Sequence, residues 1–284
     1  QVVQGAAVVT VVLNFVALWK QEPRNPPRGA RPTQPDPSFT ECWQRFCQGS
    51  DAVRRLVIVG LGTIGFGMAD IVLEPYGGEV LGLSVSATTK LTALLAFGGL
   101  MGFAFAWFRM ARGGHAYRVT QLGTVLGVPA FGLVIVAAPL DMPSLFLLGN
   151  LMIGFSGALF WHGTLTATMS LAPKDQAGLA LGAWGAVQAT AAGVAMSLSG
   201  ILRDAVQYMV EGSAPVLGIA TAATGYMAVY AMEIALLLIT IAATFPLLRR
   251  VADGQRSDTR AAGEVAHAEM AIAHPAKHGG DSHR

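Results

Sequence analysis

The chain has 284 residues, of which 53% are hydrophobic and only 13% are charged, and its mean hydropathy is +0.51. Soluble globular domains rarely have this composition, so we expect a membrane protein. The net charge of +2 is small and the basic residues are dispersed among the joints between apolar runs, which argues against a nucleic-acid-binding protein.

The chain opens with an apolar run, residues 1–19, that is followed rather than preceded by basic residues. A secretory signal peptide carries its positive charge first, so this run does not fit one. We interpret residues 1–19 as the end of a membrane helix that leaves into the cytoplasm. We also expect an N-terminal half to precede it in the intact protein.

Residues 20–53 contain six prolines, which exclude regular helix or sheet over most of the segment and predict a cytoplasmic linker. A short amphipathic stretch over residues 39–46 is expected along the membrane surface. Cys42 and Cys47 alone do not form a zinc site, and the histidines of the C-terminal segment have no fixed geometry. We therefore expect no metal site in the protein.

Six further apolar runs are each long enough to cross a bilayer, whose hydrocarbon core takes about 20 apolar residues as a helix. They cover residues 55–73, 84–108, 119–139, 144–170, 177–201 and 215–247. The sequence thus predicts an all-α membrane protein with a six-helix transmembrane bundle over residues 54–250. Residues 251–284 are poor in large apolar side chains and are expected to form a disordered tail.

The polar joints between the runs alternate in charge. Joints expected inside the cell carry Lys20, Arg24, Arg28, Arg31, Arg45, Arg54, Arg55, Arg109, Arg112, Arg118, Lys174, Arg249 and Arg250. The other joints are mainly acidic. Because basic residues stay on the cytoplasmic side, this pattern predicts a multi-pass protein with its C-terminus in the cytoplasm.

Glycine patterns occur in several runs. Residues 60–65 match the G-x-G-x-x-G dinucleotide fingerprint, but Pro75 interrupts the required helix and no strand–helix alternation follows. The pairs Gly98-x-x-x-Gly102 and Gly178-x-x-x-Gly182 favour close helix packing. We expect this packing mainly within the bundle, and a homo-oligomer is the alternative.

Polar side chains within apolar runs are candidate functional residues, because each costs free energy in lipid unless it is paired or faces a cavity. The candidates are His162, Trp161, Asn150, Gln188 and Glu233. The imidazole of His162 can ligate the magnesium of a tetrapyrrole or relay protons, and the Glu233 carboxyl group can couple transport to protons. Hydrogen bonding within the bundle is an equally good explanation for both.

Two further clusters lie at the expected membrane boundaries. Asp70, Glu74 and Glu79 flank a break at Pro75 and Gly77-Gly78, which suggests a docking or gating element at the outer face. On the cytoplasmic side, a tight Gly-Gly turn with arginines at both helix ends is predicted. It contains Arg109, Arg112, Gly113, Gly114 and Arg118.

The stretch Leu73-Glu74-Pro75-Tyr76-Gly77-Gly78-Glu79 is much more selective than glycine spacing. With Phe66 to Asp70 before it and Thr88-Thr89-Lys90 after it, the sequence resembles the bacteriochlorophyll-delivery branch of the major facilitator superfamily, the PucC/LhaA light-harvesting assembly proteins. The resemblance extends over residues 1–250. It implies a twelve-helix fold, of which this chain supplies the end of helix 6, the central loop and helices 7–12.

The resemblance implies an assembly factor for light-harvesting complex 1 or 2 in the inner (intracytoplasmic) membrane of a purple photosynthetic bacterium. Such a protein would bind bacteriochlorophyll transiently and pass it to the antenna α and β polypeptides, with the pigment's synthesis enzymes as further partners. The pigment would lie in aromatic grooves with one polar ligand to its metal. The candidate groove residues are Phe103, Phe105, Trp107, Phe155, Phe160 and Trp161, and the candidate polar contacts are His162, Asn150 and Gln188.

Two other function classes remain open. One is a proton-coupled secondary transporter of a small solute, with Glu233 or Asp70 as the coupling group. The other is a structural chaperone that binds antenna helices without pigment. No set of catalytic residues converges in the sequence, so we expect a protein that is not an enzyme.

Overall fold

The computed structural model describes residues 2–18, 38–48, 51–171, 177–210 and 221–273, and of residues 253–273 only the backbone. α-Helix is the only regular structure in these ranges. The chain divides into two units, residues Gln1–Phe39 and Thr40–Arg284. The first unit contains α1 (Val2–Leu18), whose described side chains over residues 8–16 are exposed. Its role as the end of a spanning helix stays a prediction.

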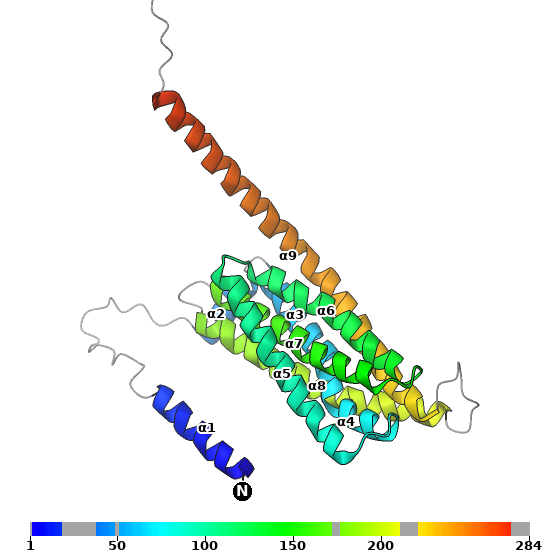
Figure 1. Ribbon diagram of the computed structural model, residues 1–284. Coiled ribbons are helices and arrows are strands. Elements are labelled where there is room, and N and C mark those ends of the chain that lie inside the picture. Colours follow the sequence, from blue (N-terminus) through cyan, green and yellow to red (C-terminus); the bar gives the residue numbers. More distant parts are fainter. Residues whose placement is uncertain (1, 19–37, 49–50, 172–176, 211–220, 274–284) are drawn as a thin grey trace, which may run out of the picture. The chain divides into compact units, whose positions relative to one another are not determined.

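The second unit contains six helical segments that are long and apolar enough to cross a membrane (Figure 1). The first, Ala52–Glu79, consists of α3 (Ala52–Gly67) and α4 (Ala69–Glu79). The others are α5 (Val85–Ala111), α6 (Ala116–Ala137), α7 (Pro143–Leu171), α8 (Ala177–Val210) and α9 (Thr221–Ala273). The prediction of an all-α membrane protein with six spans is confirmed. Residues 215–220 of the last predicted span and the linker from residue 20 to 37 lie outside the described ranges.

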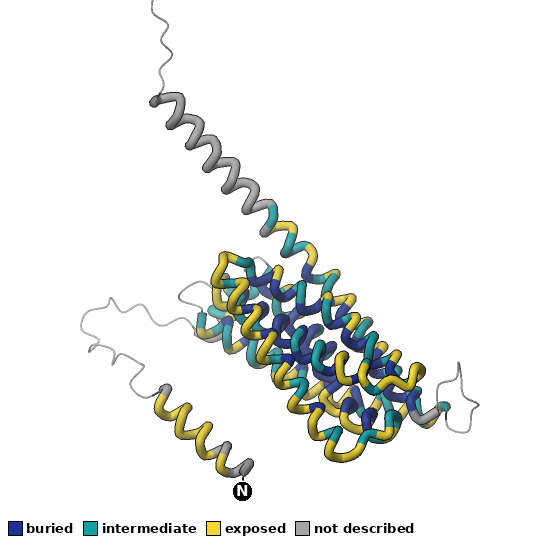
Figure 2. The backbone as a smooth tube through the Cα atoms, viewed as in Figure 1, coloured by how far each residue is buried: buried dark blue, intermediate teal, exposed yellow. Residues whose placement is uncertain are grey.

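Helix α7 packs against both α5 and α6, while α3 packs against α8 and α9. Buried residues lie mainly on the facing sides of α3, α6 and α7, and much of α5 and α8 is exposed (Figure 2). Gly98 and Gly102 of α5 pack against α7, because a Cβ atom at either position would collide with a carbonyl oxygen of that helix, at Leu151 or Phe155. Packing within the bundle through this glycine pair is therefore confirmed.

The second glycine pair differs from the expectation. A Cβ atom added at Gly178 or Gly182 of α8 meets nothing within 4 Å in the described residues. The side of α8 that packs inside carries alanines instead, among them Ala191 and Ala195. The prediction of intramolecular packing through Gly178 and Gly182 is therefore wrong within the described residues, because other positions of α8, such as Ala191 and Ala195, make its buried contacts.

The glycines that match a dinucleotide fingerprint lie within α3. A side chain at Gly62 would collide with the ring of Phe160 on α7. The glycine at this position thus lets an aromatic ring approach the helix backbone, in agreement with the membrane-helix interpretation of the motif.

The Leu-Glu-Pro-Tyr-Gly-Gly motif is helical, so the predicted break at Pro75 and Gly77-Gly78 is wrong. Tertiary packing explains the difference. Tyr76 is fully buried and its hydroxyl donates to the Val134 carbonyl oxygen at 3.2 Å. Its ring lies 5.5 Å from that of Phe146, and Gly77 lies against the same ring. The chain turns only after Glu79, where Gly82 has a φ of +62°.

A polar network joins the end of α4 to α8 and α9. Arg203 donates to the Glu79 carboxylate at 3.0 Å and to the Tyr226 hydroxyl at 2.8 Å. The Tyr226 hydroxyl in turn donates to the same Glu79 oxygen at 2.6 Å. Glu79 therefore has a structural role that the sequence did not indicate.

The turn between α5 and α6 agrees with the prediction. Gly113 has a φ of +77°, which favours glycine, and the Gly114 N–H donates to the Arg109 carbonyl oxygen at 2.9 Å. The Arg112 guanidinium lies 3.8 Å above the Phe108 ring. Arg109, Arg112 and Arg118 are all exposed around this turn.

Two shorter predictions have different outcomes. The amphipathic stretch over residues 39–46 is helical, as α2 (Phe39–Gln48).

The tail is not disordered from residue 251, because α9 continues to Ala273. Residues 260–273 are rich in good helix formers, namely alanine, arginine, glutamate and methionine. Their intrinsic helix propensity favours a helix here although the segment has few large apolar side chains. Residues 274–284 lie outside the described part.

Candidate functional site

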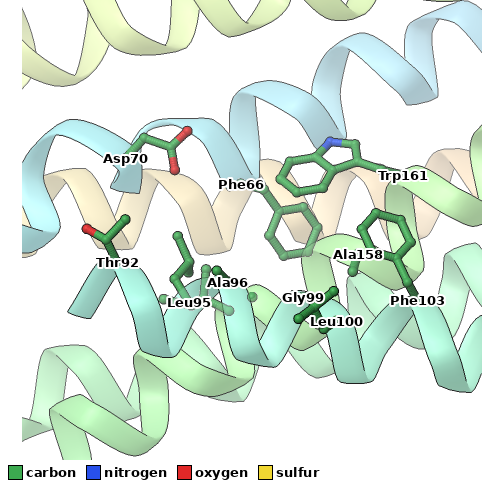
Figure 3. Close-up of a pocket in the computed structure, with 12 residues that line it drawn as sticks. Phe66, Asp70, Thr92, Leu95, Ala96, Gly99, Leu100, Phe103, Ala158 and Trp161 are labelled. Atoms are coloured by element: carbon green, nitrogen blue, oxygen red, sulfur yellow. The ribbon is translucent and has the colours of Figure 1, made fainter. Parts of the chain in front are cut away.

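An apolar cleft of 440 Å³ lies between α3, α4, α5 and α7 (Figure 3). Its lining residues are Phe66, Asp70, Thr92, Leu95, Ala96, Gly99, Leu100, Phe103, Ile153, Gly154, Ala158 and Trp161. The volume is typical of a small-molecule site. Leu100 is 68% exposed and Phe103 is 44% exposed, so the cleft is bordered by the outer surface of α5, within a membrane-spanning segment.

A smaller cavity of 210 Å³, here called the polar annex, adjoins the apolar cleft. It is lined by Asp70, Leu73, Glu74, Leu91, Thr92, Leu95 and Asn150. Three of these residues, Asp70, Thr92 and Leu95, line both cavities. The two cavities therefore adjoin each other at these three residues, one with an apolar and the other with a polar lining.

The hydrogen-bond donors of the polar annex are already used within the protein. The Thr92 hydroxyl donates to the Glu74 carboxylate at 2.6 Å. The Asn150 amide nitrogen donates to the Leu91 carbonyl oxygen at 2.7 Å, whereas its amide oxygen has no partner among the described residues. Asn150 is fully buried. An unpaired buried acceptor costs free energy, which makes it a candidate ligand contact.

The Asp70 carboxylate lies where the two cavities join. It forms neither a hydrogen bond nor an ion pair with any residue that the structure describes. Figure 3 places Asp70 and Thr92 at one end of the cleft and Trp161 and Phe103 at the other. An acidic side chain in a membrane span without a protein partner is a strong candidate for ligand contact.

The opposite end of the cleft is aromatic. The Phe66 ring centroid lies 6.2 Å from that of Trp161 and 5.7 Å from that of Phe160. The Trp161 indole N–H is shielded from solvent and has no acceptor within the described ranges. The nitrogen would reach a bound molecule only after the indole ring turns, because the structure leaves it almost no accessible surface.

The predicted site residues only partly converge. Trp161 lines the apolar cleft and Asn150 lines the polar annex. His162 lines neither; its ring lies edge-on to Phe103, with centroids 6.0 Å apart. Gln188, half-buried on α8, also lines neither cavity.

The predicted acidic residues separate into three places. Asp70 and Glu74 meet at the annex, and Glu79 belongs to the network with Arg203. Glu233 is fully buried on α9 near Ala69, and neither carboxylate oxygen has a partner among the residues described. It lies outside both cavities.

The predicted aromatic groove is correct only in part. Phe103 and Trp161 line the cleft, whereas Phe105, Trp107 and Phe155 do not. Phe160 is fully buried in the core rather than facing lipid, because it fills the space left by Gly62. Within the described chain, no group of three or more His, Cys, Asp or Glu side chains could hold a metal ion.

Sequence reasoning missed Phe66, Thr92 and Leu95 as site residues. Phe66 and Leu95 have no sequence feature that separates them from ordinary core residues. Thr92 pairs with Glu74 across 18 positions, a contact that depends on the packing of α4 against α5. Gly99, whose lack of a side chain leaves open space beside the cleft, was the available signal.

Comparison with known proteins gives consistent matches. Residues 1–252 match the sequence model of the family described as PUCC protein. The chain is 48% identical to Protein PucC of Cereibacter sphaeroides over 256 residues, which is 90% of this chain and 54% of the relative. It is 52% identical to Protein PucC of Rhodovulum sulfidophilum over 209 residues, or 73% of this chain and 46% of the relative.

A more distant relative is the bacteriochlorophyll synthase 44.5 kDa chain of Rhodobacter capsulatus, 28% identical over 205 residues, 66% of this chain and 45% of that protein. The chain thus spans about half the length of the curated relatives it matches. No solved structure matches it.

Proposed function

Because the chain belongs to the PucC family, we propose that it takes part in assembling light-harvesting complex 1 or 2 by holding bacteriochlorophyll and delivering it to antenna α and β polypeptides. The family resemblance of the Leu-Glu-Pro-Tyr-Gly-Gly motif supports this role. The relative whose printed name refers to bacteriochlorophyll synthase supports a connection with the pigment.

The observation that carries the proposal is the apolar cleft with its polar annex. Bacteriochlorophyll is a flat, mostly apolar molecule with a hydrocarbon tail, a central metal and a few carbonyl groups. The cleft offers aromatic walls at Phe66, Phe103 and Trp161, and its border on the exposed side of α5 lets the tail remain in lipid. When bound, the pigment supplies the light-absorbing group that the antenna polypeptides need.

The residues present fit such a ligand. The Trp161 N–H is free to donate to a carbonyl group once the indole ring turns, and Asp70 and Asn150 supply oxygen atoms without protein partners in the described chain. These residues bind and orient; none of them is placed to carry out bond-breaking chemistry. We therefore propose a binding and transfer role rather than an enzymatic one.

The proposed environment is the inner, intracytoplasmic membrane, with the C-terminus in the cytoplasm, as the alternating basic joints indicate. The proposed partners are antenna polypeptides and the enzymes that supply pigment. The open glycine side of α8, with Gly178 and Gly182, is available for a second copy in a homo-oligomer.

A proton-coupled secondary transporter of the major facilitator type is the alternative function. The observation that favours it is Glu233, a fully buried carboxyl group whose two oxygens lack partners among the described residues. Such a group within a span is a candidate for proton coupling. Its position away from the cleft makes this function the second choice.

The test is the absorption spectrum of the purified protein from a photosynthetic host. We expect co-purified bacteriochlorophyll, and we expect Gly99→Phe to remove it by filling the cleft, since a Cβ atom at Gly99 meets only the Gly154 oxygen at 3.9 Å. Gly132→Phe is the matched control, because Gly132 of α6 has nothing within 4 Å. A colourless protein that moves protons with a solute would support the transporter instead.

A further inference from the structure

The join between the apolar cleft and the polar annex contains one side chain whose chemistry neither the fold nor the packing explains. Asp70 lines both cavities, lies in a membrane-spanning segment, and has no hydrogen bond or ion pair with the described residues. Glu79, nine residues later, has the partners Arg203 and Tyr226. Glu74 accepts a hydrogen bond from Thr92. Among the three carboxylates of this stretch, Asp70, Glu74 and Glu79, only Asp70 therefore lacks a partner in the described residues.

The polar annex offers acceptors without free donors. The Thr92 hydroxyl and the Asn150 amide nitrogen both donate to protein atoms, at 2.6 Å and 2.7 Å. The groups left to contact a ligand are all acceptors: the carboxylates of Asp70 and Glu74 and the amide oxygen of Asn150. The Asn150 side chain is fully buried, and its amide oxygen has no partner in the described part of the chain. A phosphate or carboxylate group is excluded from this end by charge repulsion, whereas a metal ion or a donor group is favoured.

The other end of the cleft has the opposite character. The Trp161 indole N–H is a donor without an acceptor in the described residues, and Phe66 and Phe103 flank it. A ligand that fits both ends needs an acceptor at its rim and an electron-pair-accepting centre near Asp70. A magnesium tetrapyrrole has carbonyl groups at its rim and an electron-pair-accepting metal at its centre.

Resting on the proposed function, we propose that Asp70 ligates the central metal of the bound pigment through a carboxylate oxygen, with Trp161 as a positioning residue that donates to a rim carbonyl. His162, the ligand suggested by the sequence, does not line the cleft; its ring lies edge-on to that of Phe103, with centroids 6.0 Å apart. Hard cations such as Mg²⁺ also prefer oxygen ligands.

The test compares bacteriochlorophyll a with bacteriopheophytin a, the same pigment without its metal, in absorption titrations of the purified protein. The unaltered protein should bind the metal-containing pigment more tightly. Asp70→Ala should weaken bacteriochlorophyll binding roughly 10- to 100-fold, the range seen when a metal site loses its support, and should leave bacteriopheophytin binding unchanged. Asp70→Asn, which keeps an oxygen at the site, should retain part of the preference. His162→Ala should retain all of it.

Different failures have different meanings. Equal binding of the two pigments by the unaltered protein, or a loss of the preference in His162→Ala instead of Asp70→Ala, would overturn the metal-ligand role while leaving pigment binding intact. If Asp70→Ala weakened the binding of both pigments equally, the residue would act only through folding or the shape of the cavity. Absence of binding of either pigment to the unaltered protein would refute the proposed function itself. Tighter binding of an ammonium-bearing phospholipid than of pigment would assign the annex to a lipid headgroup.

Discussion

At Gly98 the lack of a side chain lets α5 lie directly against the backbone of α7. Gly98→Ala should therefore destabilise the protein, because the new Cβ atom collides with the Leu151 carbonyl oxygen. We expect a loss of about 1–3 kcal/mol, as for other overpacked interiors. Thermal unfolding of the protein in detergent measures it.

Gly182→Ala is the matched control for this prediction. A Cβ atom at Gly182 meets nothing within 4 Å in the described chain, so the same substitution should be neutral or slightly stabilising through better helix propensity. Equal destabilisation by both substitutions would contradict the packing of α5 on α7. A change confined to the oligomeric state of Gly182→Ala would instead show that this side of α8 contacts a second copy.

Individual residues also show how far the sequence could predict the site. Asn150 and Trp161 were recognised because polar groups are rare in apolar runs, and Asp70 and Glu74 because they flank Pro75 and Gly77-Gly78 at an expected membrane boundary. All four line the two cavities. Their separation from Glu233 and Gln188 could not be predicted. Which way a polar residue points depends on the rotation of its helix, and in runs that are apolar all round nothing in the sequence sets this rotation.

At the scale of elements, the turn between α5 and α6 gives a pH-dependent prediction. His115 caps α6, with its Nδ1 accepting the Tyr117 backbone N–H at 3.4 Å. Burial lowers the pKa of His115, and the charge of Arg118 lowers the pKa further. The neutral imidazole is thus favoured in the folded state, and only this form can accept the hydrogen bond.

Because the folded protein holds the His115 proton less tightly than the unfolded chain, the stabilisation is complete above the unfolded pKa of about 6.5. It is lost as the pH falls from that value toward the lower folded pKa. We expect the unfolding temperature to drop between pH 7.5 and pH 5 by more in the unaltered protein than in His115→Asn. Asparagine caps a helix without titrating in this range. Identical pH profiles for the two proteins would contradict the role of His115.

The elements themselves were predicted with different success. The number and positions of the spans could be predicted from the lengths of the apolar runs, because the thickness of the bilayer, and not the packing of neighbouring helices, sets the length that a span needs. The helical state of the Pro75 and Gly77-Gly78 segment did not follow, because Tyr76 is held there by Phe146 and by the Val134 carbonyl. Such contacts join residues far apart in the chain and override local helix propensity.

At the scale of the whole molecule, the alternation of basic joints gives a topology that fusion reporters can test. A periplasm-active phosphatase fused at Gly82 or Asp141 should be active, and one fused at Gly113 or after the last residue should be inactive. A cytoplasm-active fluorescent reporter should give the opposite pattern. Activity of the phosphatase at Gly113 would reverse the proposed orientation and the cytoplasmic placement of the C-terminus.

The amino-acid sequence alone determined that the protein is an α-helical membrane protein, with six helices in the described residues that are long and apolar enough to span a bilayer, since apolar length and composition carry that information directly. It also identified the family, through the motif around Tyr76 that the comparisons support. Only the tertiary structure decided that Asp70, Asn150, Thr92 and Trp161 line two adjoining cavities while His162 and Glu233 line neither. The reason is geometric: a cavity exists where side chains of several helices fail to fill the space between them, and this depends on how the helices are rotated and spaced against one another.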